Sequence, residues 1–382
     1  MNKNSFHTVY ISFGSNKGDR LKYITEALKE IEIQLGRIDK ISCLYKSKSW
    51  GFKSRDFYNG CFVLKTKYSL KIVLKTLLKI ESSIGRVRKK SNVYLDREID
   101  LDILFFDSVI IKSKGLTVPH PRINYRKFVL IPLCDINPNF IHPETKKSIF
   151  KILSASIEKE SLKKIKQNNY YIPFWNKCSF ISIEGNIGVG KTTLTKIFKS
   201  HFEINSLNES FKKNPHLEKF YLNSKLFSSK LENFFLIERT KQIKSHFLNY
   251  KNKKTISDYW IGKSLVFAKN NLTDILFSDF KSKYLSQVQQ LRMPDLVIYL
   301  QQKTDQLQKQ IKKRGRFYEK NISKKYLESI SKEYENIFNQ KQNFLLIVIN
   351  SREVSELTSK KGQQKLFRKL FKFLYQNKNP RV

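Results

Sequence analysis

Two short stretches of the sequence combine residue types and spacings that suit phosphate chemistry. The first runs from Gly185 to Thr192 and fits the pattern G-x-x-x-x-G-K-[ST], with Gly188, Gly190 and Lys191 inside it. Backbone N–H groups of such a loop point at phosphate oxygens, and the N-terminus of the following helix adds its dipole. Lys191 would bridge the β and γ phosphates, and Thr192 would hold Mg2+. The pattern therefore predicts a nucleoside triphosphate site.

The second stretch is DREIDLDILFF, in which Asp100 and Asp102 stand two positions apart. Residues two apart on a strand point to one face, so both carboxylates would lie together while Ile99, Leu101 and Ile103 face a core. Adjacent carboxylates repel unless a cation lies between them, and Mg2+ bridging triphosphate oxygens suits such hard ligands. The alternative is a pair of acids on a solvated sheet face.

Basic residues on both sides of this acidic pair favour the metal–phosphate interpretation. An arginine fork can hold two phosphate oxygens at once. The flanking residues are Arg86, Arg88, Lys89, Arg97, His120, Arg122 and Arg126. A second polyphosphate site is therefore expected in the first half of the chain.

The elements of the first half predict how the acidic pair is positioned. TVYISFGS, FYNGCFVLKT and IDLDILFF resemble strands, and DRLKYITEALKEIEIQL has apolar residues at helical spacing. SLKIVLKTLLKIESSIG predicts a second helix that begins after Ser69 as N-cap and ends near Gly85. LTVPHPRINYRKFVLIPLCDI predicts a loop and a short helix. This order indicates an α+β sandwich of one sheet and a helical layer.

The second half has a different pattern. FISIE predicts a strand that enters the glycine loop, TTLTKIF begins a helix, and PDLVIYL and FLLIVIN are later buried strands. This pattern is typical of an α/β domain with a parallel sheet. A polar segment broken by proline precedes it, so we predict domains at 1–160 and 178–382 with a linker at 161–177. The basic amphipathic segment QQKLFRKLFKFLYQNKN is expected to pack on the second domain; the alternative is membrane-surface binding.

Four motifs of the second half resemble the deoxynucleoside kinase family. They are IEGNIGVGKTT, LNESFKKNPHLEKFY, ISDYW and IKKRGRFYEKNISKKYLESI, and the resemblance covers residues 178 to about 350. It implies that the ATP site includes Thr193 beside the loop residues and that a sugar 5′-hydroxyl is the acceptor. Relatives commonly form dimers, so a homodimer through this domain is expected by analogy.

The resemblance also implies roles for individual residues of the kinase half. Glu209 would orient the 5′-hydroxyl and take its proton. Arg314 and Arg316 would meet charge on the transferring phosphoryl group, while Asp258 and Glu319 would bind the substrate. Two positions depart from the family pattern, because Ser210 and Tyr259 stand where arginine is common among relatives. Their loss predicts weaker phosphate stabilisation or an altered choice of deoxynucleoside.

The first half resembles 6-hydroxymethyl-7,8-dihydropterin pyrophosphokinase, an enzyme family of folate synthesis. The motifs are GSN, FYNGCFVLKT, IGRVRK, R-x-x-D-L-D-I-L and LTVPH, in this order, within residues 7 to 145. The resemblance implies a ferredoxin-like α+β fold and transfer of a pyrophosphoryl group from ATP to the pterin hydroxymethyl oxygen, with release of AMP.

Roles in this half carry over by position. Asp100 and Asp102 would hold two Mg2+, and Arg86, Arg97 and His120 would contact the ATP phosphates or the transferring group. Further implied ATP contacts are Arg88, Lys89 and Arg126, and implied pterin contacts are Asn59, Trp50 and Phe128. Tyr94, Leu95 and Asp96 stand where the family has Trp-Gly-Pro, which changes how that loop can bend, and Pro121 stands where an aromatic residue is common.

The composition limits the possible partners. The 382 residues carry a net charge of +40, but lysine runs through the whole chain, which favours a solvated surface and anionic substrates over nucleic-acid binding. Four scattered cysteines fit a reducing cytoplasm. We therefore predict a cytoplasmic, bifunctional ATP-dependent transferase with Mg2+ and small-molecule substrates and no membrane partner. The alternatives are one active half with the other as scaffold, and a basic nucleic-acid-associated P-loop ATPase.

Overall fold

The computed structural model describes residues 5–49, 54–86, 95–113, 115–156, 162–166, 170–251 and 253–377. The chain divides into two compact units, Met1–Phe174 with His201–Glu203 and Trp175–Ser200 with Ile204–Val382. Among the residues singled out in the sequence, Trp50, Arg88, Lys89 and Tyr94 lie outside the described ranges.

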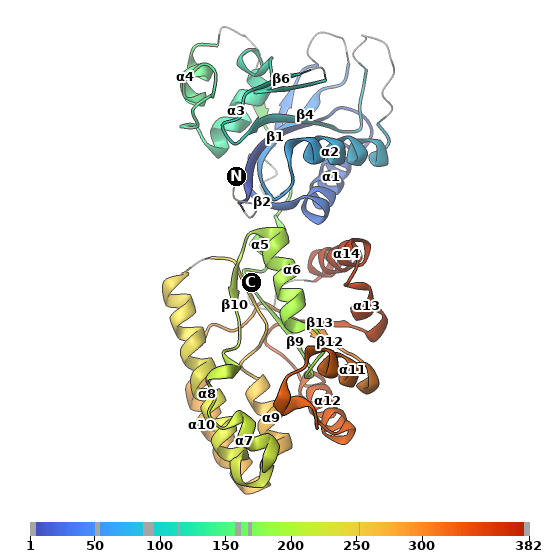
Figure 1. The fold of residues 1–382 in the computed structure, drawn as a ribbon. Coiled ribbons are helices and arrows are strands. Elements are labelled where there is room, and N and C mark those ends of the chain that lie inside the picture. Colours follow the sequence, from blue (N-terminus) through green and yellow to red (C-terminus); the bar gives the residue numbers. More distant parts are fainter. Residues whose placement is uncertain are drawn as a thin grey trace. The chain divides into compact units, whose positions relative to one another are not determined.

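The first unit is built on an antiparallel sheet with the strand order β5-β1-β4-β3-β8 and with β2 paired to β4 (Figure 1). Its strands are β1 (His7–Ser15), β2 (Gly36–Ile41), β3 (Tyr45–Ser47), β4 (Phe57–Thr66), β5 (Asp100–Phe106) and β8 (Lys163–Lys164), with β6 (Ile111–Ser113) and β7 (Leu116–Val118) as a separate pair. Its helices are α1 (Arg20–Gln34), α2 (Leu70–Ile84), η1 (Ile123–Tyr125), α3 (Lys127–Ile136) and α4 (Ile149–Ser154).

The two long helices of this unit begin and end where the sequence predicts. The Asp19 side chain accepts a hydrogen bond from the Lys22 N–H and caps α1. Ser69 is the N-cap residue of α2 in extended conformation, although its side chain makes no cap bond. Gly85 ends α2 with φ of 114°, a left-handed conformation that glycine adopts without strain.

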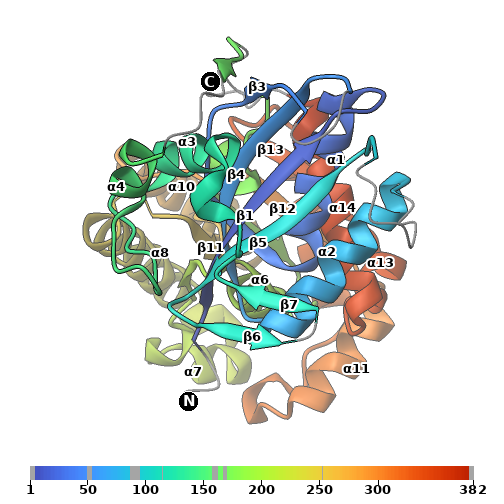
Figure 2. The same ribbon diagram turned by 90° about the horizontal axis from the view of Figure 1, so that it is seen from above.

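The helices cover the two faces of the sheet unequally. Figure 2 shows α1 and α2 on one side of the strands and α3 and α4 on the other. Tyr10, Cys61 and Leu104 pack against apolar residues of α3 and α4 such as Val129 and Ile149. The polar residues that follow along β1, β4 and β5 are not part of this apolar cluster. The two helices therefore cover only part of this face of the sheet.

The predicted linker contains residues that belong to this sheet. Lys163 and Lys164 form β8 and pair with β3. Further along, the hydroxyl of Tyr171 donates a hydrogen bond of 2.6 Å to the buried carboxylate of Glu32, which also accepts the Phe174 N–H at 3.1 Å. The division between the two units falls after these contacts, at Phe174.

The second unit contains a five-stranded parallel sheet in the order β10-β11-β9-β12-β13. The strands are β9 (Phe180–Gly185), β10 (Asn205–Leu207), β11 (Thr255–Ser257), β12 (Leu296–Leu300) and β13 (Leu345–Ile349). The helices are α5 (Phe174–Lys177), which begins at the division, α6 (Lys191–Phe202), η2 (Phe211–Lys213), α7 (Leu217–Leu222), α8 (Ser224–Asn249), α9 (Lys263–Asn271), α10 (Asp274–Val288), α11 (Thr304–Arg314), η3 (Phe317–Glu319), α12 (Lys324–Phe338), α13 (Ser351–Glu356) and α14 (Lys360–Gln376).

The C-terminal amphipathic segment forms α14 and packs into the second unit. Leu366, Phe367, Leu370, Phe371 and Leu374 are all buried on one side of this helix. The prediction that it contributes to the core is confirmed.

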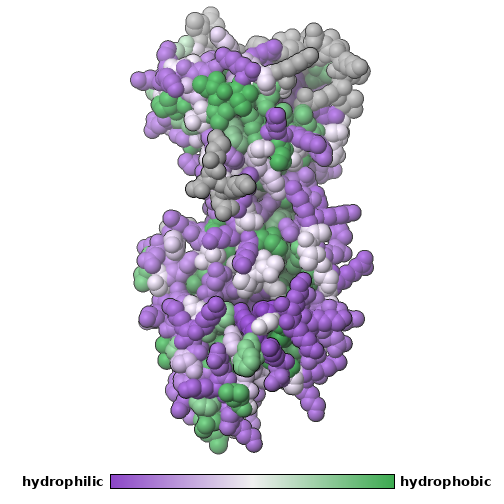
Figure 3. All heavy atoms as spheres, in the orientation of Figure 1, coloured by the Kyte–Doolittle hydropathy of each residue, from purple (hydrophilic) through white to green (hydrophobic). Residues whose placement is uncertain are grey.

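The charged residues spread widely over the surface. Figure 3 shows hydrophilic side chains over much of the visible face of each unit, with apolar patches between them. This distribution agrees with the interpretation of the lysines as solvated surface. Among the described residues, we find no helix with the length and apolar character needed to cross a membrane.

Candidate active sites

The first candidate site lies on the same sheet face as α3 and α4, in the part that these helices leave uncovered. In the register of the sheet, Asp102 lies opposite Ser12, while Asp100 and Asn59 lie on either side of Gly14. A cavity of about 240 Å³ opens above these strand positions. Its lining includes Ser12, Gly14, Ser47, Lys48, Phe57, Asn59, Arg86, Arg97, Asp100, Asp102, His120, Arg126 and Phe128. Most of the residues predicted for this half therefore converge, although they come from distant parts of the chain.

Two arginines hold the carboxylate of Asp100. The Arg86 guanidinium donates short hydrogen bonds to Asp100 and to the buried Glu81, and Arg97 donates another to Asp100. The Arg97 guanidinium also lies 5.7 Å from the centre of the Phe57 ring. Both arginines therefore stand beside the acidic pair at the cavity wall.

Asp102 has a different environment from Asp100. Burial and the charge of Asp100 together raise the pKa of Asp102 to about 7, although Arg126 opposes the shift. The two carboxylates share one face and disfavour each other's ionisation, so hard oxygen donors lie where a divalent cation would relieve the repulsion. The residues present fit Mg2+. No cluster of three or more potential metal-binding side chains occurs in the part of the chain that the structure describes, so other ligands would come from phosphate or water.

His120 is uncharged at neutral pH. Burial together with Arg126 and Arg122 lowers its pKa to about 4. Its Nδ1 accepts the Arg122 N–H at 3.3 Å, which leaves the other ring nitrogen to donate. The predicted contact with phosphate would therefore be a hydrogen bond from a neutral ring. Arg126 lies 5.5 Å over the ring of Phe128, at the same wall.

Asn59 is fixed by its neighbours. Its Nδ2 donates to the Ser47 hydroxyl at 2.9 Å, and the side chain is buried. A Cβ at Gly14 would come within 3.0 Å of the Asn59 Oδ1. Glycine at position 14, which pairs with Asn59 in the sheet, therefore leaves room for the Asn59 amide. The amide is thus held in one orientation beside the cavity, as recognition of a flat polar ring requires.

The second candidate site lies at the carboxyl edge of the parallel sheet. The glycine loop connects β9 to α6, and Gly185, Gly188 and Gly190 have φ of 143°, 83° and 104°. A Cβ at Gly185 would meet the Leu300 carbonyl oxygen at 2.5 Å, so the close backbone approach requires glycine there. Lys191 donates to the carbonyl oxygens of Gly185 and Asn186 at 2.6 and 2.9 Å, and it closes the loop on itself.

A cavity of about 120 Å³ opens beside this loop. Its lining includes Gly188, Lys191, Thr192, Glu209, Glu232, Phe235, Arg239, Asp258, Lys263, Asn271, Arg314, Arg316, Glu319 and Tyr326. Thr193 is exposed in the first turn of α6 and is not part of this lining, and neither are Gly185 and Gly190.

Parallel strands bring three predicted residues together. Glu209 follows β10 and Asp258 follows β11, and the sheet order places β11 between β10 and β9. Asp258 accepts the Thr192 hydroxyl at 2.8 Å through Oδ2 and the Glu209 N–H at 2.8 Å through Oδ1. A threonine hydroxyl bonded to a carboxylate at the start of the loop helix offers oxygen ligands that fit Mg2+. Asp258, predicted to bind substrate, therefore lies directly beside the predicted metal ligand.

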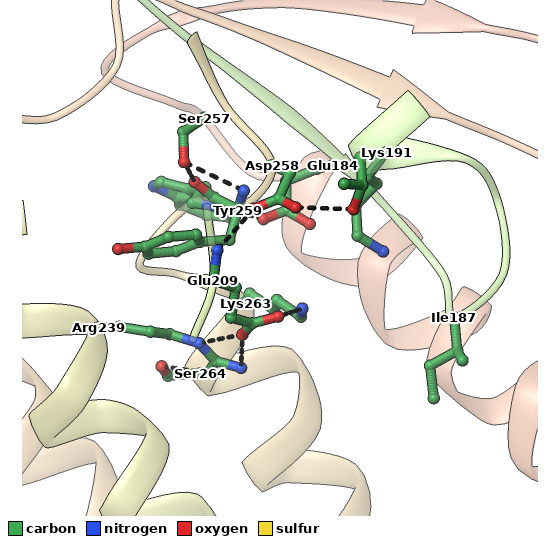
Figure 4. Close-up of polar contacts among 12 residues, drawn as sticks. Glu184, Ile187, Lys191, Glu209, Arg239, Ser257, Asp258, Tyr259, Lys263 and Ser264 are labelled. Atoms are coloured by element: carbon green, nitrogen blue, oxygen red, sulfur yellow. Dashed lines mark hydrogen bonds and ion pairs between the residues drawn. The ribbon is translucent and has the colours of Figure 1, made fainter. Parts of the chain in front are cut away.

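Glu209 is clamped by two cations that the sequence interpretation missed. Figure 4 shows its carboxylate between Arg239 of α8 and Lys263 of α9. Arg239 donates from Nε at 2.8 Å and approaches through Nη2 at 2.6 Å, and the Nζ of Lys263 lies 2.6 Å from the other oxygen. Burial alone would raise the pKa of Glu209, but Lys263 and Arg239 outweigh it and hold that pKa far below its usual range.

Tyr259 stands where an arginine is common among relatives, but the site keeps positive charge beside Glu209. Its side chain is completely buried and directs its hydroxyl to Gln242 at 3.1 Å, away from Glu209 (Figure 4). Lys263 supplies the nearby cation instead, from the first turn of α9, five residues after Asp258. Positive charge beside Glu209 is thus provided from other sequence positions than the expected one.

The charged groups around Glu209 also shift the pKa of Lys191. Burial and the charge of Lys263 lower its pKa to about 8, while Glu184, Glu209 and Asp258 oppose the shift. Lys191 remains mostly protonated at neutral pH, and an added polyanion would favour the charged form.

The predicted lid arginines bind a carboxylate within their own segment. Arg314 makes a short ion pair with Glu319, and Arg316 donates to the other oxygen of Glu319 at 3.1 Å. The Arg316 guanidinium also lies 3.8 Å over the ring of Phe211. The three predicted residues are brought together at the cavity, with Glu319 acting as the partner of the arginines.

The lining of this cavity also includes a buried acidic group that the sequence interpretation missed. Glu232 of α8 is 1% exposed, and its Oε1 accepts the Asn271 amide at 2.8 Å. Its Oε2 is buried and has no hydrogen-bond partner among the described residues. Burial raises the pKa of Glu232 to about 7, and Arg239 and Asn271 oppose that rise. A spacing of seven residues from Arg239 on one helix could have indicated the shared face.

Two cavities that gather phosphate-binding groups define the chain as an ATP-dependent transferase with a kinase in each unit. The model of the family described as 7,8-dihydro-6-hydroxymethylpterin-pyrophosphokinase matches residues 10–138, and that of the family described as deoxynucleoside kinase matches residues 181–374. The chain belongs to both families, the first through its N-terminal half and the second through its C-terminal half.

Two relatives with similar sequences agree with this assignment. The chain is 42% identical over 171 residues to a 2-amino-4-hydroxy-6-hydroxymethyldihydropteridine pyrophosphokinase of Aquifex aeolicus, a match that covers 44% of this chain and 95% of the relative. It is 39% identical over 170 residues to a deoxyguanosine kinase of Bacillus subtilis, covering 44% of this chain and 82% of the relative. A solved structure of a deoxyadenosine kinase from M. mycoides with bound dATP aligns with a TM-score of 0.44 and 27% identity, over 50% of this chain and 99% of that one.

Proposed function

We propose that the protein carries out two separate reactions with ATP. The N-terminal cavity transfers a pyrophosphoryl group to 6-hydroxymethyl-7,8-dihydropterin and releases AMP, as a step of folate synthesis. The C-terminal cavity transfers a phosphoryl group to the 5′-hydroxyl of a deoxynucleoside and releases ADP. The observation that supports this most directly is that each unit has its own cavity, lined by its own carboxylates and cations.

In the first reaction, Asp100 and Asp102 would hold Mg2+, which neutralises charge on the triphosphate. Arg86 and Arg97 would exchange the Asp100 carboxylate for phosphate oxygens, since guanidinium groups bind both in the same bidentate way. Neutral His120 would donate a hydrogen bond to the transferring group. Asn59, in its fixed orientation, would bind the polar edge of the pterin. The ferredoxin-like form of the antiparallel sheet and its helices is part of this proposal.

In the second reaction, Glu209 would orient the 5′-hydroxyl. A carboxylate with a strongly lowered pKa is a weak proton acceptor, so its main contribution would be to position the nucleophile. This suits phosphoryl transfer, in which positioning and charge stabilisation account for most of the rate. Lys191, Lys263 and the lid arginines would meet the charge of the transferring group, and Thr192 would bind Mg2+ beside Asp258.

Glu232 supports a purine deoxynucleoside as the acceptor. The Watson–Crick edge of guanine presents two neighbouring N–H donors, which match the two oxygens of an ionised carboxylate. The same edge of adenine presents one donor and one acceptor, which match a protonated carboxyl group. With a pKa of about 7, Glu232 would take either form near neutral pH. The similarity to a deoxyguanosine kinase favours guanine as the preferred base.

This assignment predicts a purine preference that changes with pH. The ratio of kcat/KM for deoxyguanosine to that for deoxyadenosine is expected to rise as the pH increases from 6 to 8, because Glu232 loses its proton in this range. Glu232→Gln, whose amide offers one donor and one acceptor, is expected to favour deoxyadenosine at every pH and to remove the pH step. Glu238→Gln, on the same helix, is the matched control. A Glu232→Gln variant with the wild-type ratio would contradict the assignment.

A homodimer through the kinase domain is also part of this proposal. Exposed apolar residues on α8 and α10 support it: Ile237, Leu248, Ile275 and Leu285. We further propose that the kinase domain begins near residue 178, after a connecting segment at 161–177 whose Lys163 and Lys164 pair with the sheet of the first unit.

The identity of the spent nucleotide tests the proposed function. Incubation with ATP, Mg2+ and 6-hydroxymethyl-7,8-dihydropterin is expected to yield AMP, and incubation with a purine deoxynucleoside is expected to yield ADP. Omission of Mg2+ should stop both reactions. Formation of only one product would mean that the other half is a scaffold. ATP hydrolysis without either acceptor, stimulated by DNA that stays bound at about 200 mM salt, would instead favour a nucleic-acid-associated ATPase.

A further inference from the structure

Arg97 is held at its backbone by a buried asparagine from another loop. Asn16 follows β1 and is completely buried. Its Oδ1 accepts the Arg97 N–H at 2.8 Å, and its own N–H donates to the Arg97 carbonyl oxygen at 3.2 Å. This two-point contact sets the backbone of a residue whose guanidinium stands on Asp100 in the first cavity.

Asp96 connects this asparagine to a third loop. The Asp96 Oδ1 accepts the Asn16 Nδ2 at 2.8 Å and a short hydrogen bond from the hydroxyl of Ser54. Asn16 Nδ2 also lies 3.1 Å from the Ser54 hydroxyl, which closes a triangle of hydrogen bonds. One carboxylate oxygen thereby joins the segments after β1, before β4 and before β5. We call Asn16, Ser54 and Asp96 the loop clasp.

A neighbouring ion pair reinforces the contact between the first and third segments. The Lys17 ammonium lies 2.5 Å from the Glu98 carboxylate, so residues on both sides of Arg97 bind residues 16 and 17. Asp96 itself is exposed and does not line the cavity. Its hydrogen bond to Asn16 therefore connects it to the backbone of Arg97 by a route other than the peptide bond between the two residues.

We propose that Asp96 is a positioning residue for pyrophosphoryl transfer, acting through the loop clasp on Arg97. The inference rests on the function proposed for the first cavity. A proline at this position would stiffen the backbone but accept no side-chain hydrogen bond through its ring. Asp96 instead fixes this part of the backbone by hydrogen bonds to two other loops. Contacts between segments thereby take the place of the local stiffness that a proline would provide. The guanidinium of Arg97 then meets the triphosphate from a set direction.

The test compares Asp96→Ala with Asp96→Asn in the full-length protein. Asn keeps an Oδ1 acceptor for Asn16 and Ser54, whereas Ala removes it. For Asp96→Ala we expect kcat/KM for AMP formation to fall about ten- to a hundredfold, since a misplacement of ~1 Å can cost about a hundredfold. Asp96→Asn is expected to stay within about threefold of wild type, because a neutral acceptor keeps most of the bond. Leu95→Ala, an exposed neighbour, is the matched control.

A double-mutant cycle with Arg97→Ala separates positioning from general stability. If Asp96 acts through Arg97, Asp96→Ala adds little further loss when Arg97 is already Ala, whereas independent effects would multiply. ADP formation by the second unit should stay unchanged in every variant, which shows that the effect is confined to the first unit. Multiplicative losses, or a full-activity Asp96→Ala, would overturn the proposal.

Amide hydrogen exchange tests the loop clasp independently of the proposed activity. Exchange at the Arg97 N–H is expected to be slow in wild type and Asp96→Asn and faster in Asp96→Ala, because the Asn16 acceptor loses its anchor. Unchanged exchange in Asp96→Ala would overturn the inference even if AMP forms. Absence of AMP in wild type would refute the proposed function instead, while a change in exchange would still establish the clasp.

Discussion

Asp100→Ala is expected to abolish AMP formation and leave ADP formation intact, whereas Lys191→Ala should do the reverse. Asp100 is the carboxylate on which Arg86 and Arg97 converge, and it shares its face with Asp102. Its removal would take away a proposed metal ligand and leave the two guanidinium groups without their common partner. We expect the rate of pyrophosphoryl transfer to fall at least about a hundredfold, the usual cost of losing one group that stabilises transition-state charge.

Lys191 is the counterpart in the second cavity. It lies at the start of α6 with its ammonium group inside the glycine loop, where the phosphates would replace carbonyl oxygens as partners. A similar loss of at least about a hundredfold in ADP formation is expected for Lys191→Ala. Lys196→Ala, exposed on the same helix, is the matched control.

The measurement is product analysis of each variant with both acceptors present. Asp100→Asn should behave like Asp100→Ala, because the neutral amide keeps the shape but loses the charge that binds metal. Each variant carries an internal control, since the untouched activity shows that the effect is confined to the unit that carries the substitution. Loss of both activities in either variant would contradict two independent sites.

That these residues lie together could be predicted from the sequence because the signals are local. The glycine loop is contiguous, and its strand and helix flanks follow from short apolar patterns. The alternation of Asp100 and Asp102 with buried Ile99, Leu101 and Ile103 is equally local, and the three apolar residues are indeed in the core.

The parts that sequence reasoning missed depend on long-range contacts. Arg239 is 30 residues and Lys263 is 54 residues from Glu209, and they meet it only because the middle of α8 and the start of α9 line the same cavity. The lost arginine at Tyr259 therefore looked like a lost charge, although packing supplies that charge from other elements. Glu232 was missed for the same reason, because its importance lies in an unpartnered oxygen that only the packed structure reveals.

Lys263→Met is expected to lower kcat for ADP formation about a hundredfold with a smaller change in KM for the deoxynucleoside. Methionine keeps a long side chain at this nearly buried position but removes the charge beside Glu209. The carboxylate would then rest on Arg239 alone, so its direction toward the 5′-hydroxyl would no longer be fixed from both sides. The pKa of Lys191 should rise as well, since Lys263 is one of the groups that lower it.

The pH dependence of stability provides a second signature of this change. The pKa of Glu209 is lower in the folded protein than its ordinary value of 4.5, so Glu209 stabilises the fold above about pH 4.5 and loses this contribution as the pH falls. Lys263→Met brings the folded pKa closer to 4.5, and the variant should therefore lose less stability than wild type between pH 5 and 3.

Lys263→Arg is the rescue variant and Lys269→Met is the matched control. Arginine restores a cation at the same position, so it should recover part of kcat and the steeper acid dependence of unfolding. Lys269, exposed on the same helix and paired with Asp274, has no contact with Glu209, and its replacement should change neither property. A Lys263→Met variant that kept wild-type kcat while the pH dependence of its unfolding free energy flattened would contradict the prediction. The charge of Lys263 would then stabilise the Glu209 carboxylate and the fold without positioning the nucleophile.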